Sequence, residues 1–414
     1  MQSHDYRSGS RIPELDGVRG LAVLLVIAYH YIGGIVENAT SSSVVLLGHC
    51  VSLWWTGVDL FFVLSGFLIG GILIDHRNST NYFKTFYVRR ACRILPIYFL
   101  WIALFLLGTC LLSAYASSGW YSVDFRQLAN FPQWGYFLFL QNFNMAKLNV
   151  CGASWIGVTW SLCVEEQFYL LTPLMIWLIS PRHLARVLVV LIVSVPLFRI
   201  FLYLYHPDLL MYVLLPCRAE GLLLGILCAW LVRNQTCSDL IRLKRDWLYL
   251  LFFILFCGMV YLTFFSAKKG WFPSVNSLEM VSFGYTWISL FYALFLLMAV
   301  MVGTKLLAQT MRWQWLRHFG KISYCMYLIH LAIFGFVQDV FIRNNWLKLP
   351  VFLQAMATLL LSFGIVWLFA FLSWRLYEKP IIDRGHSFSY GDSKLLPQAA
   401  RNPAGVISPQ SHAD

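Results

Sequence analysis

The hydrophobic positions of the 414-residue chain fall into long runs that are separated by short polar segments. A helix needs about 20 mostly apolar residues to cross the hydrocarbon core of a bilayer. The pattern therefore predicts an all-α polytopic membrane protein with about ten transmembrane helices. The ten runs lie near 20–38, 52–75, 94–115, 160–180, 186–205, 209–232, 247–266, 282–303, 322–342 and 350–374. Between the third and fourth runs, residues 131–159 are expected to form a half-buried or re-entrant piece.

Composition agrees with this picture, and the charges orient it. The chain is 59% hydrophobic and 12% charged, whereas soluble domains carry about 25% charged residues. With the N-terminus inside, 23 of the 31 lysines and arginines fall in cytoplasmic segments and six fall outside. This excess predicts that both termini are cytoplasmic. The net charge of +12 then faces anionic lipid headgroups, so it does not indicate nucleic-acid binding.

Three regions follow from the spans. Residues 1–19 form a cytoplasmic N-terminal segment and 20–380 a transmembrane domain, and 381–414 form a cytoplasmic tail. The tail is rich in Ser, Pro, Gly and Gln, so it is expected to be disordered. The ten cysteines show no metal-ligand spacing, and we expect no metal centre. Cys50 and Cys151 both fall on the outer side, which leaves open whether they form a disulfide.

The stretch RGLAVLLVIAYH places an arginine and a histidine on the same helix face. Arg19 and His30 are eleven positions apart, which is three turns plus about 20° and roughly 16 Å along the axis. If Arg19 lies at the membrane surface, His30 lies near the middle of the bilayer. A neutral imidazole there suits a general base or a nucleophile; the alternative is a structural histidine bonded to a carbonyl. Asp16 is expected to cap the helix or to pair with Arg19.

Two further segments carry polar stripes on one helix face. In GKISYCMYLIH, Ser323, Tyr327 and His330 follow one another at helical spacing, and His330 is expected at a depth similar to that of His30. WSLCVEEQFYLLTP has a second stripe, for which Glu165 is the interior candidate. Glu166 points about 100° away, toward a lateral interface or the surface. The second stripe consists of Ser161, Glu165, Tyr169 and Thr172.

Charged residues also cluster at both membrane surfaces. Arg89, Arg90 and Arg93 lie within about one turn at the cytoplasmic edge, where guanidinium groups suit bidentate phosphate binding. The alternative is that they only anchor the helix. On the outer side, Asp59 is expected about 10 Å deep and to orient or pair with another polar residue. Arg218 and Glu220 are expected to neutralise one another or to pair with Asp59 and Glu165.

These motifs resemble the acyltransferase-3 family of integral-membrane O-acyltransferases. The matching features run from residue 15 to about 380 in the family's order. One departure is Glu220, where the family pattern has an aspartate. The features are Arg19 and His30 as Arg-x10-His, GVDLFFVLSGFLI at 57–69, Arg90 and Arg93 as Arg-x-x-Arg, WSLCVEEQFYL, LRHFGKISYCMYLIH and WRLYEKP.

The resemblance implies transfer of an acyl group, acetyl in the first instance, from cytoplasmic acyl-CoA to a hydroxyl of a cell-surface or exported carbohydrate or glycolipid. It implies a multi-pass protein of the bacterial plasma (inner) membrane, without a permanently bound cofactor. Some members carry an extracytoplasmic esterase-like domain, and we expect none in this chain because the segment after the last span is short. We assign His30, Glu165 and Arg19 to catalysis and Arg89, Arg90 and Arg93 to acyl-CoA. A supporting polar path comprises Asp16, Asp59, Ser161, Arg218, Glu220, Ser323, Tyr327 and His330.

A proton-coupled transporter or flippase of a glycolipid or metabolite is the alternative, because intramembrane carboxylates and histidines also mark such proteins. Broken helices in paired inverted repeats would favour it, and the sequence shows no internal repeat. The residues do not identify the acceptor, the acyl group or the oligomeric state. They also leave open whether His30 acts as a base or carries the acyl group.

Overall fold

The computed structural model describes residues 12–36, 42–112, 132–207, 209–269, 275–302, 305–339 and 350–391. Helices make up nearly all of this part of the chain, and it contains no β-strand. The prediction of an all-α protein is confirmed. The long helices are α1 (Pro13–Val36), α3 (Gly57–Asp75), α4 (Tyr82–Leu112), α9 (Thr159–Leu178), α10 (Leu184–Tyr205), α11 (Leu215–Arg233), α13 (Arg245–Lys269), α15 (Tyr285–Leu297), α17 (Gln314–Gln338) and α18 (Val351–Ser373).

Shorter elements connect the long helices. Turns of π-helix flank α15 at Met280–Gly284 and Met298–Val302, and another at Trp374–Glu378 joins α18 to the next helix. Single 3-10 turns lie at Trp54–Thr56 and Met211–Val213. The short helices are α2 (Ser42–Val51), α6 (Trp134–Phe137), α7 (Gln141–Leu148), α8 (Ser154–Gly157), α12 (Gln235–Leu243), α16 (Lys305–Met311) and α19 (Lys379–His386).

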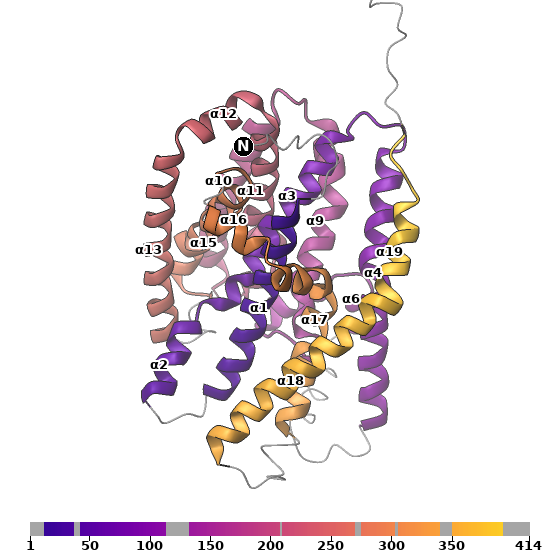
Figure 1. Ribbon diagram of the computed structural model, residues 1–414, viewed down its shortest axis with the longest axis vertical. Helices are drawn as coiled ribbons and strands as arrows, with labels where there is room; N and C mark the ends of the chain where they lie inside the picture. The colour runs from indigo at the N-terminus through magenta and orange to yellow at the C-terminus, as the bar shows by residue number, and fades with distance from the viewer. Residues whose placement is uncertain are drawn as a thin grey trace, which may run out of the picture.

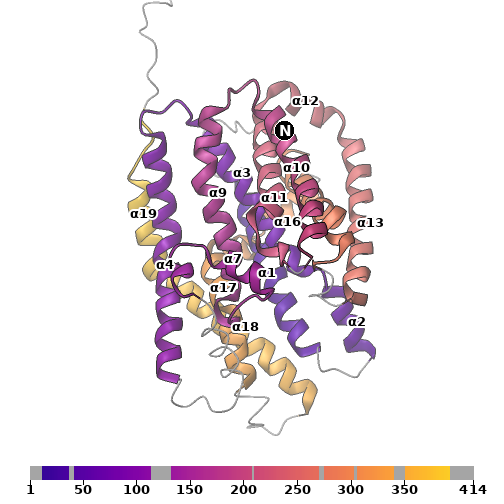
Figure 2. The same cartoon turned by 180° about the vertical axis from the view of Figure 1, so that it is seen from behind.

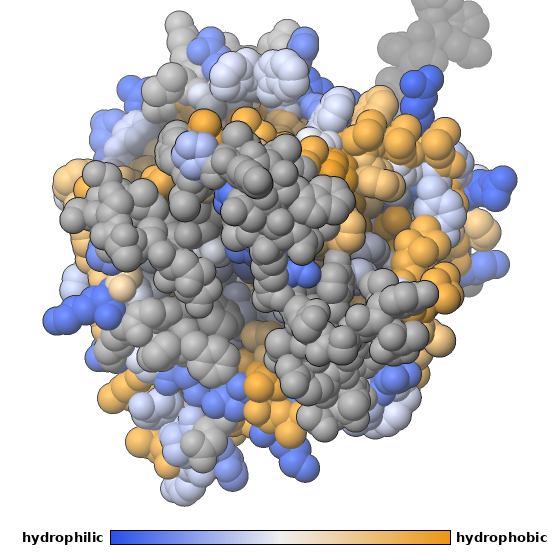
Figure 3. All heavy atoms as spheres, turned by 90° about the horizontal axis from the view of Figure 1, so that it is seen from below, coloured by the Kyte–Doolittle hydropathy of each residue, from blue (hydrophilic) through white to orange (hydrophobic). Residues whose placement is uncertain are grey.

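Nine helical segments within the described ranges are long and apolar enough to cross a membrane. They confirm the polytopic membrane protein. The tenth expected span, 160–180, is α9: it has 20 residues but is not among the nine. Large apolar side chains such as Leu104, Leu107 and Leu111 of α4 are exposed. In the view from below, apolar side chains form patches at the right and lower left of the outer rim, with polar side chains between them (Figure 3). Such a surface suits contact with lipid.

The segment between the third and fourth expected spans forms three short helices, α6, α7 and α8, in place of a span. Gln141 and Asn142 at the start of α7 are fully buried. Gln141 donates to the hydroxyl groups of Tyr98 and Thr159, and Asn142 donates to the carbonyl of Val213. Buried amide groups with hydrogen-bond partners hold this irregular segment inside the bundle.

Glycines bring the central helices into close contact. A side chain on Gly20 of α1 would overlap the Leu316 carbonyl of α17, and one on Gly320 of α17 would overlap the Asp16 carbonyl of α1. Gly66 of α3 approaches Leu222 of α11 in the same way. Small residues allow such approach of membrane helices, so these glycines fix how α1, α17, α3 and α11 pack.

The other long helices pack around the central helices α1, α3, α11 and α17. In Figure 1, α13 forms one side of the molecule, and α4 with α19 forms the other. Seen from behind, α9 stands between α4 and α11 (Figure 2), and it packs against α3 and α11. Helix α4 begins at the top end of the molecule in Figure 1, where α3 ends. We call this the α4-start end; the charge distribution predicts that it is cytoplasmic.

The prediction that residues 381–414 form a disordered tail is wrong for the first part of that segment. Residues 379–386 form α19, which packs along α4. Residues 387–391 continue along α4 and bond to it. The polar composition of the tail hides this docking because backbone carbonyls, which every residue has, make most of the contacts. Residues 392–414 lie outside the described part of the chain.

Candidate active site

Two histidines meet between α1 and α17. His330 Nε2 lies 3.1 Å from His30 Nδ1. His30 Nδ1 is 2.9 Å from the Val26 carbonyl, and His330 Nδ1 is 2.7 Å from the Tyr327 carbonyl. A carbonyl only accepts hydrogen bonds, so both Nδ1 atoms carry hydrogen, and His330 Nε2, which faces the His30 Nδ1–H, is the acceptor of a neutral ring. We assign His30 to the neutral form as well. This tautomer gives His30 Nε2 a lone pair for chemistry and lets His330 Nε2 accept from His30 Nδ1.

A cavity of about 760 Å³, its open mouth included, runs from the α4-start end toward these histidines. On α3 its walls extend from Leu68 to Val58, or about 15 Å along the helix. The two histidines do not line it; they lie beyond its inner end. The lining residues are Arg19, Val58, Phe61, Phe62, Leu64, Ser65, Leu68, Arg90, Arg93, Ile94, Ser161, Leu162, Glu165, Tyr169, Ser323, Tyr324 and Tyr327.

Tyr327 connects the cavity to the histidines. Its hydroxyl lies 2.7 Å from Ser161 Oγ and donates to the Val158 carbonyl, and its own carbonyl accepts from His330. Ser323, one turn earlier, also lines the cavity and donates to the Gly320 carbonyl. The polar face predicted for Ser323, Tyr327 and His330 is therefore present, and it points from the cavity toward His30.

The polar stripe of α9 lines the cavity as predicted for three of its four members: Ser161, Glu165 and Tyr169. Thr172 is buried and bonds back to the Phe168 carbonyl. Glu166 is not a lining residue, and its Oε1 is buried without a hydrogen-bond partner among the described residues. The two adjacent carboxyl groups thus occupy different environments.

The arginine end of the cavity contains three cations from two helices. Arg19 of α1 and Arg90 and Arg93 of α4 all line it, and Arg90 lies 5.7 Å from the centre of the Tyr169 ring. Arg19 and His30 are about 16 Å apart along α1, so Arg19 belongs to this end and not to the histidine pair. Asp16 lies one turn before Arg19 and is largely buried.

Arg89, which the sequence groups with Arg90 and Arg93, points elsewhere. Its Nε donates to the Phe388 carbonyl over 2.7 Å, and its guanidinium lies over the Tyr390 ring. It is not among the residues that line the cavity. The geometry therefore separates Arg89 from the other two arginines of the turn.

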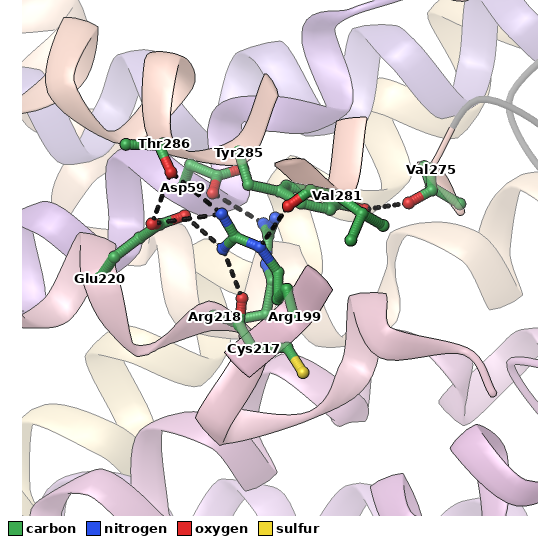
Figure 4. A network of polar contacts seen from close by, with 9 residues as sticks. All are labelled: Asp59, Arg199, Cys217, Arg218, Glu220, Val275, Val281, Tyr285 and Thr286. Carbon is green, nitrogen blue, oxygen red and sulfur yellow. Dashed lines mark hydrogen bonds and ion pairs between the residues drawn. The ribbon is translucent and has the colours of Figure 1, made fainter. Parts of the chain in front are cut away.

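The outer charges form two buried ion pairs (Figure 4). Arg218 Nη2 donates to Asp59 Oδ1 over 2.7 Å, and Arg199 Nη1 contacts Glu220 Oε1 at 2.5 Å. Arg199 also donates to the carbonyls of Cys217 and Val281 and to Thr286. Of the pairings left open by the sequence, Arg218 with Asp59 is present, whereas Arg218 with Glu220 is not. Glu220 instead pairs with Arg199.

The Arg218 pair is less completely bonded than the Arg199 pair. Asp59 Oδ2 and the Nε and Nη1 atoms of Arg218 are buried without hydrogen-bond partners in the described ranges. The Arg218 guanidinium lies 4.2 Å from the centre of the Tyr285 ring and 5.0 Å from that of Tyr212. Contact with aromatic faces offsets part of the desolvation cost of the buried cation.

Sequence reasoning did not assign Arg199, Ser65 or Tyr324 to the site. Arg199 was detectable as a cation inside an apolar run, where a charge demands a partner. Ser65 shares a helix face with Val58 and Phe61, and its hydroxyl bonds to that of Tyr169. Tyr324 donates to the Ile94 carbonyl and had no signal that set it apart from other aromatic residues.

Cys50 and Cys151 are both free thiols, so the open question of a disulfide is answered in the negative for this structure. Burial raises the pKa of the Cys151 thiol to about 12. A thiol with so high a pKa carries almost no thiolate near neutral pH and is a poor nucleophile.

The chain belongs to the family defined by the acyltransferase domain, whose model matches residues 12–371. It is similar to YrhL of Bacillus subtilis, a protein named provisionally as a peptidoglycan O-acetyltransferase, with 29% identity over 94% of this chain and 57% of that protein. It is also similar to the O-acetyltransferase OatA of Staphylococcus aureus, with 26% identity over 90% of this chain and 58% of that protein. The chain thus spans under two thirds of these relatives. No solved structure gives a significant match.

Proposed function

We propose that this protein is a membrane O-acetyltransferase of the bacterial plasma membrane. It takes an acyl group, acetyl in the first instance, from cytoplasmic acyl-CoA and transfers it to a hydroxyl of a cell-surface or exported carbohydrate. Family membership and the names of the relatives support the reaction class. The 23-to-6 distribution of basic residues supports the placement of the α4-start end in the cytoplasm.

One observation carries the proposal: a single cavity has three guanidinium groups at one end and approaches a histidine pair at the other. The phosphates of CoA suit Arg19, Arg90 and Arg93, because guanidinium groups bind phosphate oxygens in bidentate fashion. The thioester arm would then extend past Glu165 and Ser161 toward Tyr327. This arrangement separates donor binding from the reacting atoms along the membrane normal.

In direct transfer, His30 Nε2 removes the proton of the acceptor hydroxyl. The hydroxyl oxygen forms a bond with the thioester carbonyl carbon, the C–S bond breaks, and the proton passes to the leaving thiolate as free CoA forms. The transient imidazolium of His30 is stabilised at Nδ1 by the Val26 carbonyl and by the lone pair of His330 Nε2.

In the relay mechanism, His30 Nε2 itself attacks the thioester carbonyl and the CoA thiolate leaves. The acceptor oxygen then attacks the acyl-imidazole and the C–N bond breaks. The hydroxyl proton balances the released thiolate, so the net reaction is the same. Incubating the purified protein with labelled acetyl-CoA and no acceptor separates the two mechanisms, because only the relay leaves label on His30.

The experiment that tests the function uses the purified protein in proteoliposomes, with labelled acetyl-CoA on one side and glycan oligosaccharides on the other. We expect label to appear in base-labile esters on the oligosaccharide and free CoA to be released in equal amount. Movement of a glycolipid across the bilayer without ester formation would instead favour the transporter and contradict the proposal. Absence of both reactions with several carbohydrate acceptors would also contradict it.

A further inference from the structure

The five residues after α19, residues 387–391, form an ordered segment that we call the C-terminal strap. It bonds to three side chains that follow one another at intervals of four along the start of α4: Asn81, Thr85 and Arg89. Asn81 Nδ2 and Thr85 Oγ1 donate to the Ser389 carbonyl over 2.7 and 3.3 Å. Arg89 Nε donates to the Phe388 carbonyl over 2.7 Å. The strap therefore follows one face of the helix.

The far end of the strap is held at two more places. Asn81 Oδ1 accepts from the Gly391 backbone N–H over 2.6 Å, so this amide bonds to the strap in both directions. The Tyr390 ring stacks on His76 with 4.0 Å between ring centres and an interplanar angle of 3°. Burial lowers the pKa of His76, with Asp75 opposing and Arg89 adding to this effect. The neutral ring is thus favoured in the stack.

Arg89 lies between the strap and the donor site. Arg89, Arg90 and Arg93 carry like charges within about one turn, and like charges at this spacing repel one another. The Phe388 carbonyl of the strap accepts from Arg89 Nε over 2.7 Å, and the His386 carbonyl at the end of α19 accepts from Nη2 over 3.5 Å. Together these contacts orient the guanidinium toward the C-terminal segment, and Arg89 does not line the cavity that Arg90 and Arg93 line. The strap is thus bonded both to the beginning of α4 and to the arginine that precedes Arg90 and Arg93.

We infer that the C-terminal strap is a positioning element for the acyl-CoA site, which acts by holding Arg89 and the start of α4 so that Arg90 and Arg93 point into the cavity. The inference rests on the proposed function, since it concerns the donor of that reaction. The ligand of the site is the phosphate-bearing part of acyl-CoA. In the described part of the chain, the hydrogen bonds of the strap go to Asn81, Thr85 and Arg89, none of which lines the cavity, so its effect on the reaction passes through α4.

The test compares two shortened chains with the full chain. One ends after Gly391 and keeps the strap, and the other ends after His386 and lacks it. We expect the chain that ends after Gly391 to bind acetyl-CoA like the full chain. Loss of the strap frees the side chains around Arg90 and Arg93, so the dissociation constant of acetyl-CoA is expected to rise roughly tenfold. At saturating acetyl-CoA, kcat and the KM for the acceptor are expected to stay unchanged.

Arg89→Ala, made in both shortened chains, distinguishes positioning from direct contact. If Arg89 acts through the strap, the substitution weakens acetyl-CoA binding in the chain that ends after Gly391 and has little further effect in the chain that ends after His386. An equal loss in both chains would mean that Arg89 binds the donor itself, which contradicts the inference. Asn81→Ala in the full chain keeps the backbone of the strap, and it is expected to shift donor binding in the same direction.

The outcomes separate this inference from the proposed function. A full chain that binds no acetyl-CoA contradicts both. A full chain that binds acetyl-CoA, with the same affinity in both shortened chains and in Asn81→Ala, contradicts the strap alone. A loss of kcat without a change in donor affinity would likewise overturn the strap, because a general disturbance of folding would then explain it.

Discussion

His30 Nδ1 and His330 Nε2 lie 3.1 Å apart across the interface between α1 and α17. Since His330 donates its own N–H to the Tyr327 carbonyl, it presents a lone pair to His30. In the proposed reaction, this lone pair stabilises the positive charge that His30 acquires during transfer. We expect His330→Phe to lower kcat roughly tenfold to hundredfold, which corresponds to about 1.5–3 kcal/mol for a hydrogen bond to a charged group.

The control for this prediction is His330→Gln, whose amide oxygen is able to accept the same hydrogen bond. It should retain more activity than His330→Phe, while the KM for acetyl-CoA stays similar in both, because His330 does not line the donor cavity. Steady-state kinetics of acetyl transfer measure the difference. Equal rates for the wild type and both variants would show that the lone pair of His330 has no part in the reaction.

Glu165 and Glu166 provide a matched pair of neighbours. Glu165 lines the cavity on the same stripe as Ser161 and Tyr169, whereas Glu166 does not line it. We expect Glu165→Gln to damage acetyl transfer much more than Glu166→Gln, because only Glu165 of the two lines the cavity in which the substrates would meet. Comparing kcat/KM of the two variants at equal membrane abundance checks this. Similar tolerance of both substitutions would place the functional face of α9 elsewhere.

Arg90 and Arg93 are expected to bind the phosphates of the donor. Replacing either by alanine should weaken acyl-CoA binding by about 1.5–3 kcal/mol for each lost charge-assisted contact, which is roughly a tenfold to hundredfold rise in Kd. Lysine should restore only part of the affinity, because it lacks the bidentate geometry. If the arginines only anchor the helix, lysine restores everything and alanine changes abundance instead. If the double variant Arg90→Ala, Arg93→Ala binds acyl-CoA with unchanged affinity, the two arginines serve only to anchor the helix.

The Asp59–Arg218 pair is expected to contribute to the stability of the fold because each charge neutralises the other. Both side chains are buried, and Arg218 has two nitrogen atoms without hydrogen-bond partners in the described residues. Asp59→Ala alone leaves a buried cation and should destabilise the protein by about 3–5 kcal/mol. Adding Arg218→Met removes that cation and should recover much of the loss. Thermal unfolding in detergent measures both variants; additive losses in the double variant would contradict the charge-balance explanation.

The periodicity of the sequence was sufficient for the spans because burial in lipid forces long apolar helices. It also predicted the polar faces of α9 and α17, since residues three and four apart share a face whatever surrounds them. The similar depth of His30 and His330 was predictable from the number of helical turns between each histidine and the start of its helix. Their direct contact was not predictable, because it depends on how closely Gly20 and Gly320 allow α1 and α17 to approach each other.

Other parts of the site depend on partners distant in sequence. The Arg89 side chain is oriented by backbone carbonyls about 300 positions away in the sequence. The spacing of Arg89, Arg90 and Arg93 gives no information about these distant partners. Glu220 pairs with Arg199 on another helix, although Arg218 is closer in sequence. The tail after α19 has the composition of a disordered segment, yet its first residues dock through backbone groups. Composition does not encode such contacts.

The most direct test of the central claim is the rate of acetyl transfer by His30→Ala. The protein is reconstituted with labelled acetyl-CoA and a carbohydrate acceptor, and membrane insertion and acetyl-CoA affinity are measured in the same preparation. Because both mechanisms act through His30 Nε2, the rate of ester formation should fall by a factor on the order of 10²–10⁴ or more, with insertion and donor affinity unchanged. A His30→Ala protein that transfers acetyl groups at the wild-type rate would contradict the account.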